Sequence, residues 1–376
     1  MERRGFLKLV GGGVVLAAAG LAYNAQRFPD AAIAPWADAG QGHDDPRLHA
    51  LSYAILAPNP HNRQPWMAKL EGDDALTLHV DPDRLLPHTD PFNRQITIGL
   101  GCFLELLRMA AAEQGQAVEI TPFPEGGDAA ALDGRPVARV VFDGAATADP
   151  LFAHYHDRRS LKEPFDTTRT VPDAALAAII AAAQSVPAGG SIAENDIAFW
   201  RQLTRDALLV EIETPRIYKE SVDLFRFGKA EVNANPDGID FTGPLFQTLT
   251  TFGLMTREAA LDTSSTMYTQ GIDAVLANTD TAMGHVWLVS ATNSRADQIR
   301  TGADWLRMNL AATAQGIGFQ PLSQALQEYP EMSAYYDETH ARLAPDGGTV
   351  QMLSRIGYGP QVPVSPRWPL EAKLMS

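Results

Sequence analysis

The spacing of apolar residues predicts a mixed succession of helices and strands in the first part of the chain. Apolar positions recur at helical spacing over 48–56 and over 94–114, where many small residues indicate a helix buried against another one. The patterns at 75–80, 118–122 and 137–142 are typical of strands. Because no regular strand–helix–strand repeat appears, the order favours an α+β class over a Rossmann domain.

The second part of the chain contains a similar succession with a longer middle region. Helices are predicted at 174–184 and 302–315, and strands at 286–292 and 350–358. The region 196–283 begins with a helical stretch and otherwise has little clear pattern. The order therefore predicts two halves with related elements, the second one enlarged.

A weak internal repeat supports this division. Residues 101–115 align with 302–316 at an offset of 201 residues, and five of the fifteen positions are identical. The helix-then-proline segments 51–58 and 180–187 match at an offset of only 129 residues. The difference of 72 residues predicts an insertion, which we place at 196–283 and interpret as a lid or a structural flap.

Composition and charge exclude several classes of partner and site. The 376 residues include 45% hydrophobic residues, which is enough for two packed domains or one large one. A formal net charge of −15 argues against nucleic acid and anionic membrane surfaces as partners. Cys102 is the single cysteine, so no disulfide within the chain forms, and no Cys/His cluster has metal-ligand spacing.

The N-terminus has the composition of a targeting segment. Residues 3–8, RRGFLK, resemble the twin-arginine export signature, and a short apolar stretch follows at 11–22. We expect 1–28 to be an export signal or an uncleaved anchor, with a basic anchor helix as the alternative, and 29–43 to be a linker. The resemblance implies recognition by the twin-arginine export machinery and a periplasmic or exported location, either released or retained by the anchor.

Two polar segments carry the candidate chemistry. Residues 57–66, APNPHNRQPW, form a rigid loop whose amides suit a flat heteroaromatic ring with polar edges. An ordinary proline-rich turn is the alternative. Residues 157–165, DRRSLKEPF, bring two arginines, a serine and a lysine within five positions, which suits a phosphate. A solvated basic turn is the alternative here.

Together these segments resemble the signatures of nitroreductase-like FMN oxidoreductases. In this chain, Asn-Arg-Gln-Pro-Trp follows Ala-Pro-x-x-His, and Arg-Arg-Ser-x-Lys precedes a Phe and Val-Pro-x-x-x-Leu. The first signature lies in residues 44–150 and the second in residues 151–376, a division that resembles the single-chain, Acg-like branch. The resemblance implies a nitroreductase-like fold in which two related halves form a fused pseudo-dimer, with antiparallel or mixed sheets flanked by long buried helices, and a monomeric protein.

The resemblance also implies one FMN site. The loop would lie against the flavin, the basic segment and a C-terminal arginine would hold the phosphate and ribityl chain, and 318–324 would border the ring. The implied cofactor residues are Asn59, Pro60, His61, Asn62, Gln64, Arg158, Arg159, Ser160, Lys162, Pro321, Leu322, Ser323, Gln324, Ser365 and Arg367. The corresponding loop of the second half, 185–190, is only SVPAGG, which predicts a degenerate second site.

This chain departs from the family pattern in the loop. Asn59 and Pro60 stand where the family has two serines, and proline cannot donate a backbone hydrogen bond. The resemblance implies an FMN-dependent oxidoreductase that passes electrons through flavin N5 in a ping-pong scheme. The acceptor would be a quinone, a nitroaromatic or an enone, with no catalytic side chain and no metal. An FMN-binding storage or sensing protein with little turnover is the alternative.

Overall fold

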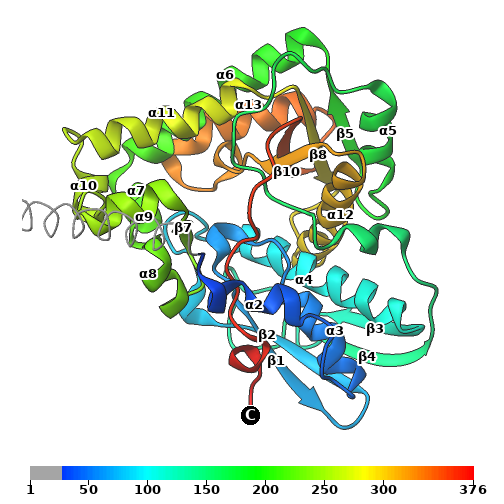
Figure 1. Ribbon diagram of the computed structural model, residues 1–376. Coiled ribbons are helices and arrows are strands. Elements are labelled where there is room, and N and C mark those ends of the chain that lie inside the picture. Colours follow the sequence, from blue (N-terminus) through cyan, green and yellow to red (C-terminus); the bar gives the residue numbers. More distant parts are fainter. Residues whose placement is uncertain (1–27) are drawn as a thin grey trace, which may run out of the picture.

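The computed structural model describes residues 28–376, which form two sheet-containing halves around a pair of long helices (Figure 1). The predicted twin-arginine motif and the apolar stretch after it lie outside the described residues. In the first half the elements are α3 (Pro46–Ala54), β1 (Trp66–Glu71), β2 (Ala75–Val80), α4 (Arg94–Glu113), β3 (Gln116–Pro122) and β4 (Ala138–Ala145). Its sheet has the order β1-β2-β4-β3, with every neighbouring pair antiparallel.

The second half repeats this topology. Its elements are α5 (Asp173–Ala181), β5 (Ala188–Ser191), β8 (Gly284–Ser290), α12 (Arg295–Ala314), β9 (Gly318–Pro321), α13 (Ser333–Leu343) and β10 (Thr349–Gly357). Its antiparallel sheet has the order β5-β8-β10-β9, so strands at equivalent places in the chain occupy equivalent places in the sheet. The predicted α+β class with antiparallel sheets, long buried helices and two related halves is confirmed.

The two halves meet where α4 crosses α12. A Cβ atom at Gly101 would lie 2.2 Å from the carbonyl oxygen of Ile299, and one at Gly302 would lie 2.0 Å from that of Ile98. Only glycine allows the backbones to approach this closely. The thiol of Cys102, the residue after the first glycine, donates to the carbonyl oxygen of Gly302 at 3.1 Å. The aligned glycines of the sequence repeat are therefore the contact point of the halves.

A block of mainly helical elements separates β5 from β8, where the first half has only a tight turn. It consists of α6 (Glu194–Glu213), α7 (Pro215–Asp223), β6 (Phe225–Phe227), α8 (Gly228–Ala234), β7 (Ile239–Phe241), α9 (Pro244–Thr251), α10 (Arg257–Leu261) and α11 (Thr266–Asp280). Trp200 and Ile217 of this block share a second hydrophobic cluster with Leu326 and Leu353 of the second half. We call residues 194–280 the insertion.

Residues 29–43 are not the linker that their Ala, Pro and Gly content predicts. They contain helix α2 (Asp30–Asp38), and its Trp36 is buried in the main core. The indole Nε1 of Trp36 donates to the carbonyl oxygen of Ser365 at 2.8 Å, and the Arg367 amide donates to that of Ala32 at 2.7 Å. The C-terminal tail thus stabilises α2, and nothing near α2 in the sequence indicates this contact.

Short 3₁₀ turns complete the fold at Pro60–Asn62, Pro82–Arg84, Pro150–His154, Gln324–Leu326, Pro330–Met332 and Leu370–Lys373. Among the described residues, α4 alone is long and apolar enough to span a membrane. Its apolar window is 94% buried inside the protein, so α4 is a core helix.

Candidate functional site

The two polar segments predicted from the sequence meet at the junction of the halves. Arg158 Nη2 donates to the carbonyl oxygen of Leu56 at 3.3 Å. Arg367 Nη2 donates to the same oxygen at 3.0 Å and to that of Ala57 at 3.1 Å. These carbonyls follow the end of α3, where a helix carries partial negative charge. The basic segment of the second half and the C-terminal tail therefore both lie against the first-half loop.

Arg158, Arg159 and Arg367 form a cationic cluster at this point. Arg158 is 4% exposed and Arg367 is 2% exposed, and no carboxylate of residues 28–376 lies within ion-pair distance of any of the three. Burial lowers the pKa of Arg158 to about 10. Burial and then the charge of Arg158 lower the pKa of Arg367 to about 9. Asp240 and Asp157 oppose the lowering of the pKa of Arg367 and Arg159, but neither carboxylate is within ion-pair distance, so a bound anion would stabilise the crowded positive charges.

Unused hydrogen-bond donors border the cluster. The Nε of Arg367 is buried without a partner among the described residues. The Ser160 hydroxyl is half-buried, and no partner for it lies in that same part of the chain. The Nε of Arg159, in contrast, is already used, because it donates to the carbonyl oxygens of Val362 and Pro363, each at 3.1 Å. Buried donors beside surplus positive charge fit the phosphate of a nucleotide-type cofactor such as FMN.

The first-half loop has an unusual backbone. His61, Asn62 and Gln64 all have φ between +47° and +50°, a left-handed conformation that non-glycine residues rarely adopt. The Asn59 side chain holds this bend by accepting from the Gln64 amide at 2.7 Å. Asn62 Oδ1 accepts from Arg367 Nη1 at 2.8 Å. Strained residues of this kind gather at binding sites, because the surrounding contacts must hold them in place.

His61 points from this loop towards the insertion. Its Nε2 lies 3.3 Å from the Ser221 hydroxyl of α7, and its Nδ1 is buried without a partner among the described residues. Burial lowers the pKa of His61 to about 3, assisted by the charges of Lys162 and Arg63. The imidazole is therefore neutral near pH 7.

Lys162 extends into the same region. Burial lowers the pKa of its amine, while Asp240 on β7 and Glu211 on α6 oppose that shift. Lys162 is nevertheless exposed to solvent. Its side chain therefore borders an open part of the site. Burial in turn raises the pKa of both Asp240 and Glu211. The sequence analysis did not identify these two carboxylates, because they lie in the insertion without a local motif.

A cavity of about 250 Å³ adjoins the cationic cluster. It is lined by Phe28, Pro29, Ile33, Asp240, Thr242, Pro363, Val364 and Pro366. Its walls therefore come from the start of the described chain, from the insertion and from the C-terminal tail. Pro366 precedes Arg367, which ties the cavity to the cluster.

Gln64 does not have the predicted role of a direct cofactor contact. Its side chain is fully buried, its Oε1 accepts from the Trp368 amide at 2.8 Å, and its Nε2 donates to the carbonyl oxygen of Pro236 at 2.6 Å. Its own carbonyl oxygen accepts from Lys373 Nζ at 2.8 Å. Every polar group of Gln64 is used within the protein, so it joins the loop to the insertion and the tail.

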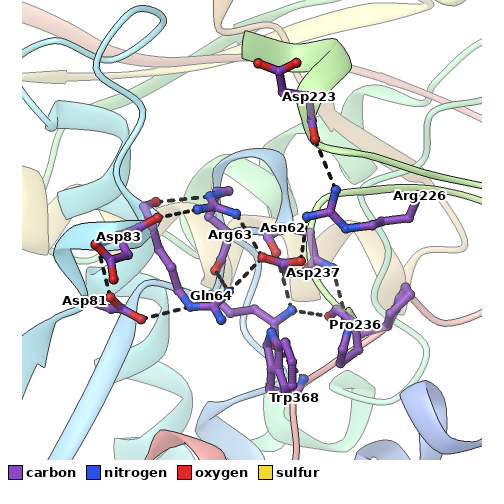
Figure 2. A network of polar contacts seen from close by, with 12 residues as sticks. Asn62, Arg63, Gln64, Asp81, Asp83, Asp223, Arg226, Pro236, Asp237 and Trp368 are labelled. Carbon is purple, nitrogen blue, oxygen red and sulfur yellow. Dashed lines mark hydrogen bonds and ion pairs between the residues drawn. The ribbon is translucent and has the colours of Figure 1, made fainter. Parts of the chain in front are cut away.

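Arg63, to which the sequence assigns no role, belongs to the same network. Figure 2 shows Asp237 of the insertion between Arg63 and Arg226, with Trp368 beside Gln64. The Asp237 carboxylate lies 2.8 Å from Arg63, 2.7 Å from Arg84 and 3.0 Å from Arg226. Three cations around one buried carboxylate fasten the insertion to the loop.

The predicted ring-bordering segment 318–324 divides into two parts. Pro321 ends strand β9, and Leu322 is buried in the second hydrophobic cluster with its amide donating to the carbonyl oxygen of Leu353 at 2.8 Å. The amide and side chain of Leu322 are therefore used within the protein, whereas the role predicted for Pro321 stays a prediction. Ser323 and Gln324 follow the strand, and the nearby Gln327 donates from Nε2 to the Glu211 carboxylate at 2.8 Å.

The corresponding loop of the second half is filled by the protein itself. Asp304 on α12 accepts hydrogen bonds from the backbone amides of residues 184–186 at 2.6–2.9 Å. A Cβ atom at Gly189 would lie 2.4 Å from the indole Nε1 of Trp287. The turn is closed by a carboxylate and packed against an indole, which leaves no comparable binding loop there.

Ser365 belongs to the cationic cluster through its hydroxyl, which accepts from Arg367 Nη1 at 2.7 Å. Trp36 packs close to two of the arginines, with its ring centre 5.6 Å from the guanidinium of Arg159 and 5.5 Å from that of Arg367. Residues 28–376 contain no group of His, Cys, Asp and Glu side chains that would hold a metal ion.

By sequence, the chain is similar to proteins of Mycobacterium tuberculosis. It is 27% identical over 337 residues to one provisionally named NAD(P)H nitroreductase acg, which covers 86% of this chain and 93% of that protein. A second provisionally named NAD(P)H nitroreductase of that species is 27% identical over 335 residues, covering 84% and 87%. No protein-family model matches the chain.

Solved structures of similar chains have lower sequence identity. A provisionally named nitroreductase from Anabaena variabilis covers 88% of this chain and 91% of its own, with 11% identity and a TM-score of 0.46. The FMN-dependent nitroreductase NfnB from Mycobacterium smegmatis, solved with NADPH, covers 57% and 92%, with 20% identity and a TM-score of 0.33. In sequence, along most of its length, this chain is thus similar to proteins named as NAD(P)H nitroreductases.

Proposed function

We propose that this protein is an FMN-dependent oxidoreductase of the nitroreductase type. The observation that carries the proposal is the cluster of Arg158, Arg159 and Arg367, which has no carboxylate partner in the described part of the chain and lies against a strained polar loop. Similarity to named nitroreductases over 86% of the chain supports the same reaction class.

The chain's residues would divide the work of binding the cofactor. The three arginines and Ser160 would hold the phosphate through charge-assisted hydrogen bonds. The loop at 59–62, with Lys162, would border the ring, and the neutral imidazole of His61 would keep the loop bent without adding charge. The bound flavin would supply the electron transfer, as cofactors do in such enzymes.

We also propose where this protein is located, how it assembles and which small molecules react with it. The RRGFLK motif at 3–8 supports export by the twin-arginine route to the periplasm, with the N-terminal segment either removed or kept as an anchor. The repeated topology within one chain supports a monomer that serves as its own pseudo-dimer. A small electron donor and a small acceptor, namely a quinone, a nitroaromatic or an enone, would use the same slot in turn.

The absorption spectrum of the purified full chain tests the cofactor assignment. We expect one FMN per polypeptide, because the second-half loop is closed by Asp304 and Trp287. Replacing Arg158→Ala together with Arg159→Ala should abolish FMN retention. Arg216→Ala together with Arg342→Ala, at exposed positions, is the matched control. Circular dichroism must show that both pairs are folded, and a folded cluster variant with full FMN content would contradict the assignment.

Anaerobic reduction tests the reaction class. Flavin absorbance of the FMN-loaded protein is followed after addition of NADH, NADPH or dithionite, and then after addition of a quinone or nitroaromatic acceptor. Reduction by a pyridine nucleotide and reoxidation by an acceptor are the expected results. Reduction by dithionite alone, without turnover, would favour a storage or sensing protein instead.

A further inference from the structure

An exposed apolar surface surrounds helix α9 of the insertion. Residues 242–256 contain no charged side chain, and α9 itself has no buried residue. Leu245 is 65% exposed, Phe252 is 63% exposed and Leu254 is 61% exposed, and Phe246 is exposed beside them. Single exposed apolar residues are common, but four of them between positions 245 and 254 indicate an interaction surface. We call these four residues the α9 surface.

The packing of α9 leaves Leu245 and Phe252 on the outside, while the ring of Phe246 is also in contact with that of Phe241 in β7. On its inner side, Gln247 Oε1 accepts from the backbone amide of Lys229 in α8 at 2.9 Å. Leu245 and Phe252 are seven positions apart. They therefore lie on the same side of α9, Phe252 being the residue directly after the helix. Figure 1 shows α9 at one edge of the molecule, on the side opposite α5.

The place where the described chain begins points to the occupant. Phe28 and Pro29 line the same cavity as Thr242, two residues before α9 starts at Pro244. The described chain therefore begins close to the start of α9, and the sequence before it includes the apolar run at 11–22. A segment of that composition has affinity for the interior of a bilayer, and where it is retained it brings α9 to the lipid.

We propose that the α9 surface inserts into the interfacial layer of a lipid bilayer, next to the point where the N-terminal segment enters the folded protein. The absence of charge from 242–256 removes the cost of desolvating charged groups there. It also means that attraction to anionic lipid plays no part, in agreement with the net charge of −15. Zwitterionic lipid is therefore the expected partner, and binding should not depend on salt.

Site-specific labelling of the full chain tests this contact. The only native cysteine, Cys102, is buried, so a cysteine introduced by Phe252→Cys is the one accessible thiol of the described chain. The residue is labelled with an environment-sensitive fluorophore, and phosphatidylcholine vesicles are added with and without spin-labelled acyl chains. We expect a blue shift on vesicle binding and loss of most of the fluorescence to the acyl-chain quencher. Leu254→Cys provides a second position with the same expectation.

Asp173→Cys, at the exposed start of α5, is the matched control and should show neither effect. Co-sedimentation reports whether the full chain is bound. Vesicle-bound protein whose probes at 252 and 254 are not quenched would overturn the proposal, as would a full chain that does not bind vesicles at all. A blue shift that needs no lipid and grows with protein concentration would assign the surface to a second copy of the chain instead, and would also overturn it.

Discussion

Burial decides which single residues carry charge at the candidate site. The arginines of the cationic cluster have a lowered pKa, yet Arg158 at about 10 and Arg367 at about 9 remain mainly protonated at neutral pH. The imidazole of His61, with a pKa of about 3, is neutral at the same pH. The site therefore offers fixed positive charge for an anion and no titrating group near pH 7 from this histidine.

A second buried histidine makes the pH dependence of folding testable. His285 on β8 is completely buried, neither ring nitrogen has a partner among the described residues, and burial lowers its pKa to about 3. Below pH 6.5 the unfolded chain binds a proton that the folded protein does not bind, so stability is lost as the pH falls. From pH 7 to pH 5 this histidine should cost about 2 kcal/mol.

Urea unfolding at both pH values measures this cost. His285→Leu should reduce the loss of stability between pH 7 and pH 5 by about that amount. His88→Leu, at an exposed position, controls for the removal of an imidazole from the chain. An equal loss in wild type and His285→Leu would show that His285 is protonated in the folded protein.

At the scale of elements, close approach of backbones explains the positions of two glycines. Gly101 and Gly302 occupy equivalent places in α4 and α12, and each faces backbone atoms of the other helix. The sequence repeat contains these glycines, so the helix pair was predictable. Helix α2 was not, because a short segment rich in Ala and Pro becomes helical here through contacts with the distant C-terminal tail.

The helix crossing should not tolerate even one methyl group. Gly302→Ala places a Cβ atom 2.0 Å from the carbonyl oxygen of Ile98, and backbone cannot move aside as a side chain does. We expect a loss of about 1–3 kcal/mol or more in the free energy of unfolding. Gly271→Ala, in an open position of α11, should instead stabilise the protein by up to about 1 kcal/mol. Equal effects of the two substitutions in urea unfolding would contradict this account of the crossing.

At the scale of the whole molecule, one buried carboxylate and the glutamine beside it join three distant regions. Asp237 of the insertion pairs with Arg63 and Arg84 of the first half, and Gln64 beside them contacts the C-terminal tail through Trp368 (Figure 2). The insertion and the tail are thus part of the framework that holds the strained loop.

Removing this carboxylate should loosen the loop as well as the fold. Asp237→Ala leaves Arg63 and Arg226 without their counter-ion and Arg84 with Asp81 alone, and we expect it to lower the free energy of unfolding by about 3–5 kcal/mol. The same variant should release FMN more readily. Asp223→Ala, at an exposed aspartate paired only with Lys219, should change stability by less than about 1 kcal/mol. Retention of full stability by Asp237→Ala would show that the network does not join these regions.

The sequence by itself determined the main helices and strands of the two halves and their order, but not α2 or most elements of the insertion. Periodicity depends on neighbours a few positions away, so the helices predicted at 94–114 and 302–315 are confirmed as α4 and α12, and the strand predicted at 350–358 as β10. The resemblance supplied the candidate residues, and the structure brings Arg158, Lys162 and Arg367 to the predicted loop.

Only the tertiary structure decided which polar groups remain free to bind a ligand. Gln64 and Ser160 are both polar residues of the two signatures, yet the groups of Gln64 are used by Pro236, Trp368 and Lys373, whereas the hydroxyl of Ser160 has no partner in the described chain. Asp240, Glu211 and Trp36 join the site from segments without a motif. Hydrogen-bond partners, burial and the resulting pKa values depend on residues that are distant in the sequence, and these contacts exist only once the chain has folded.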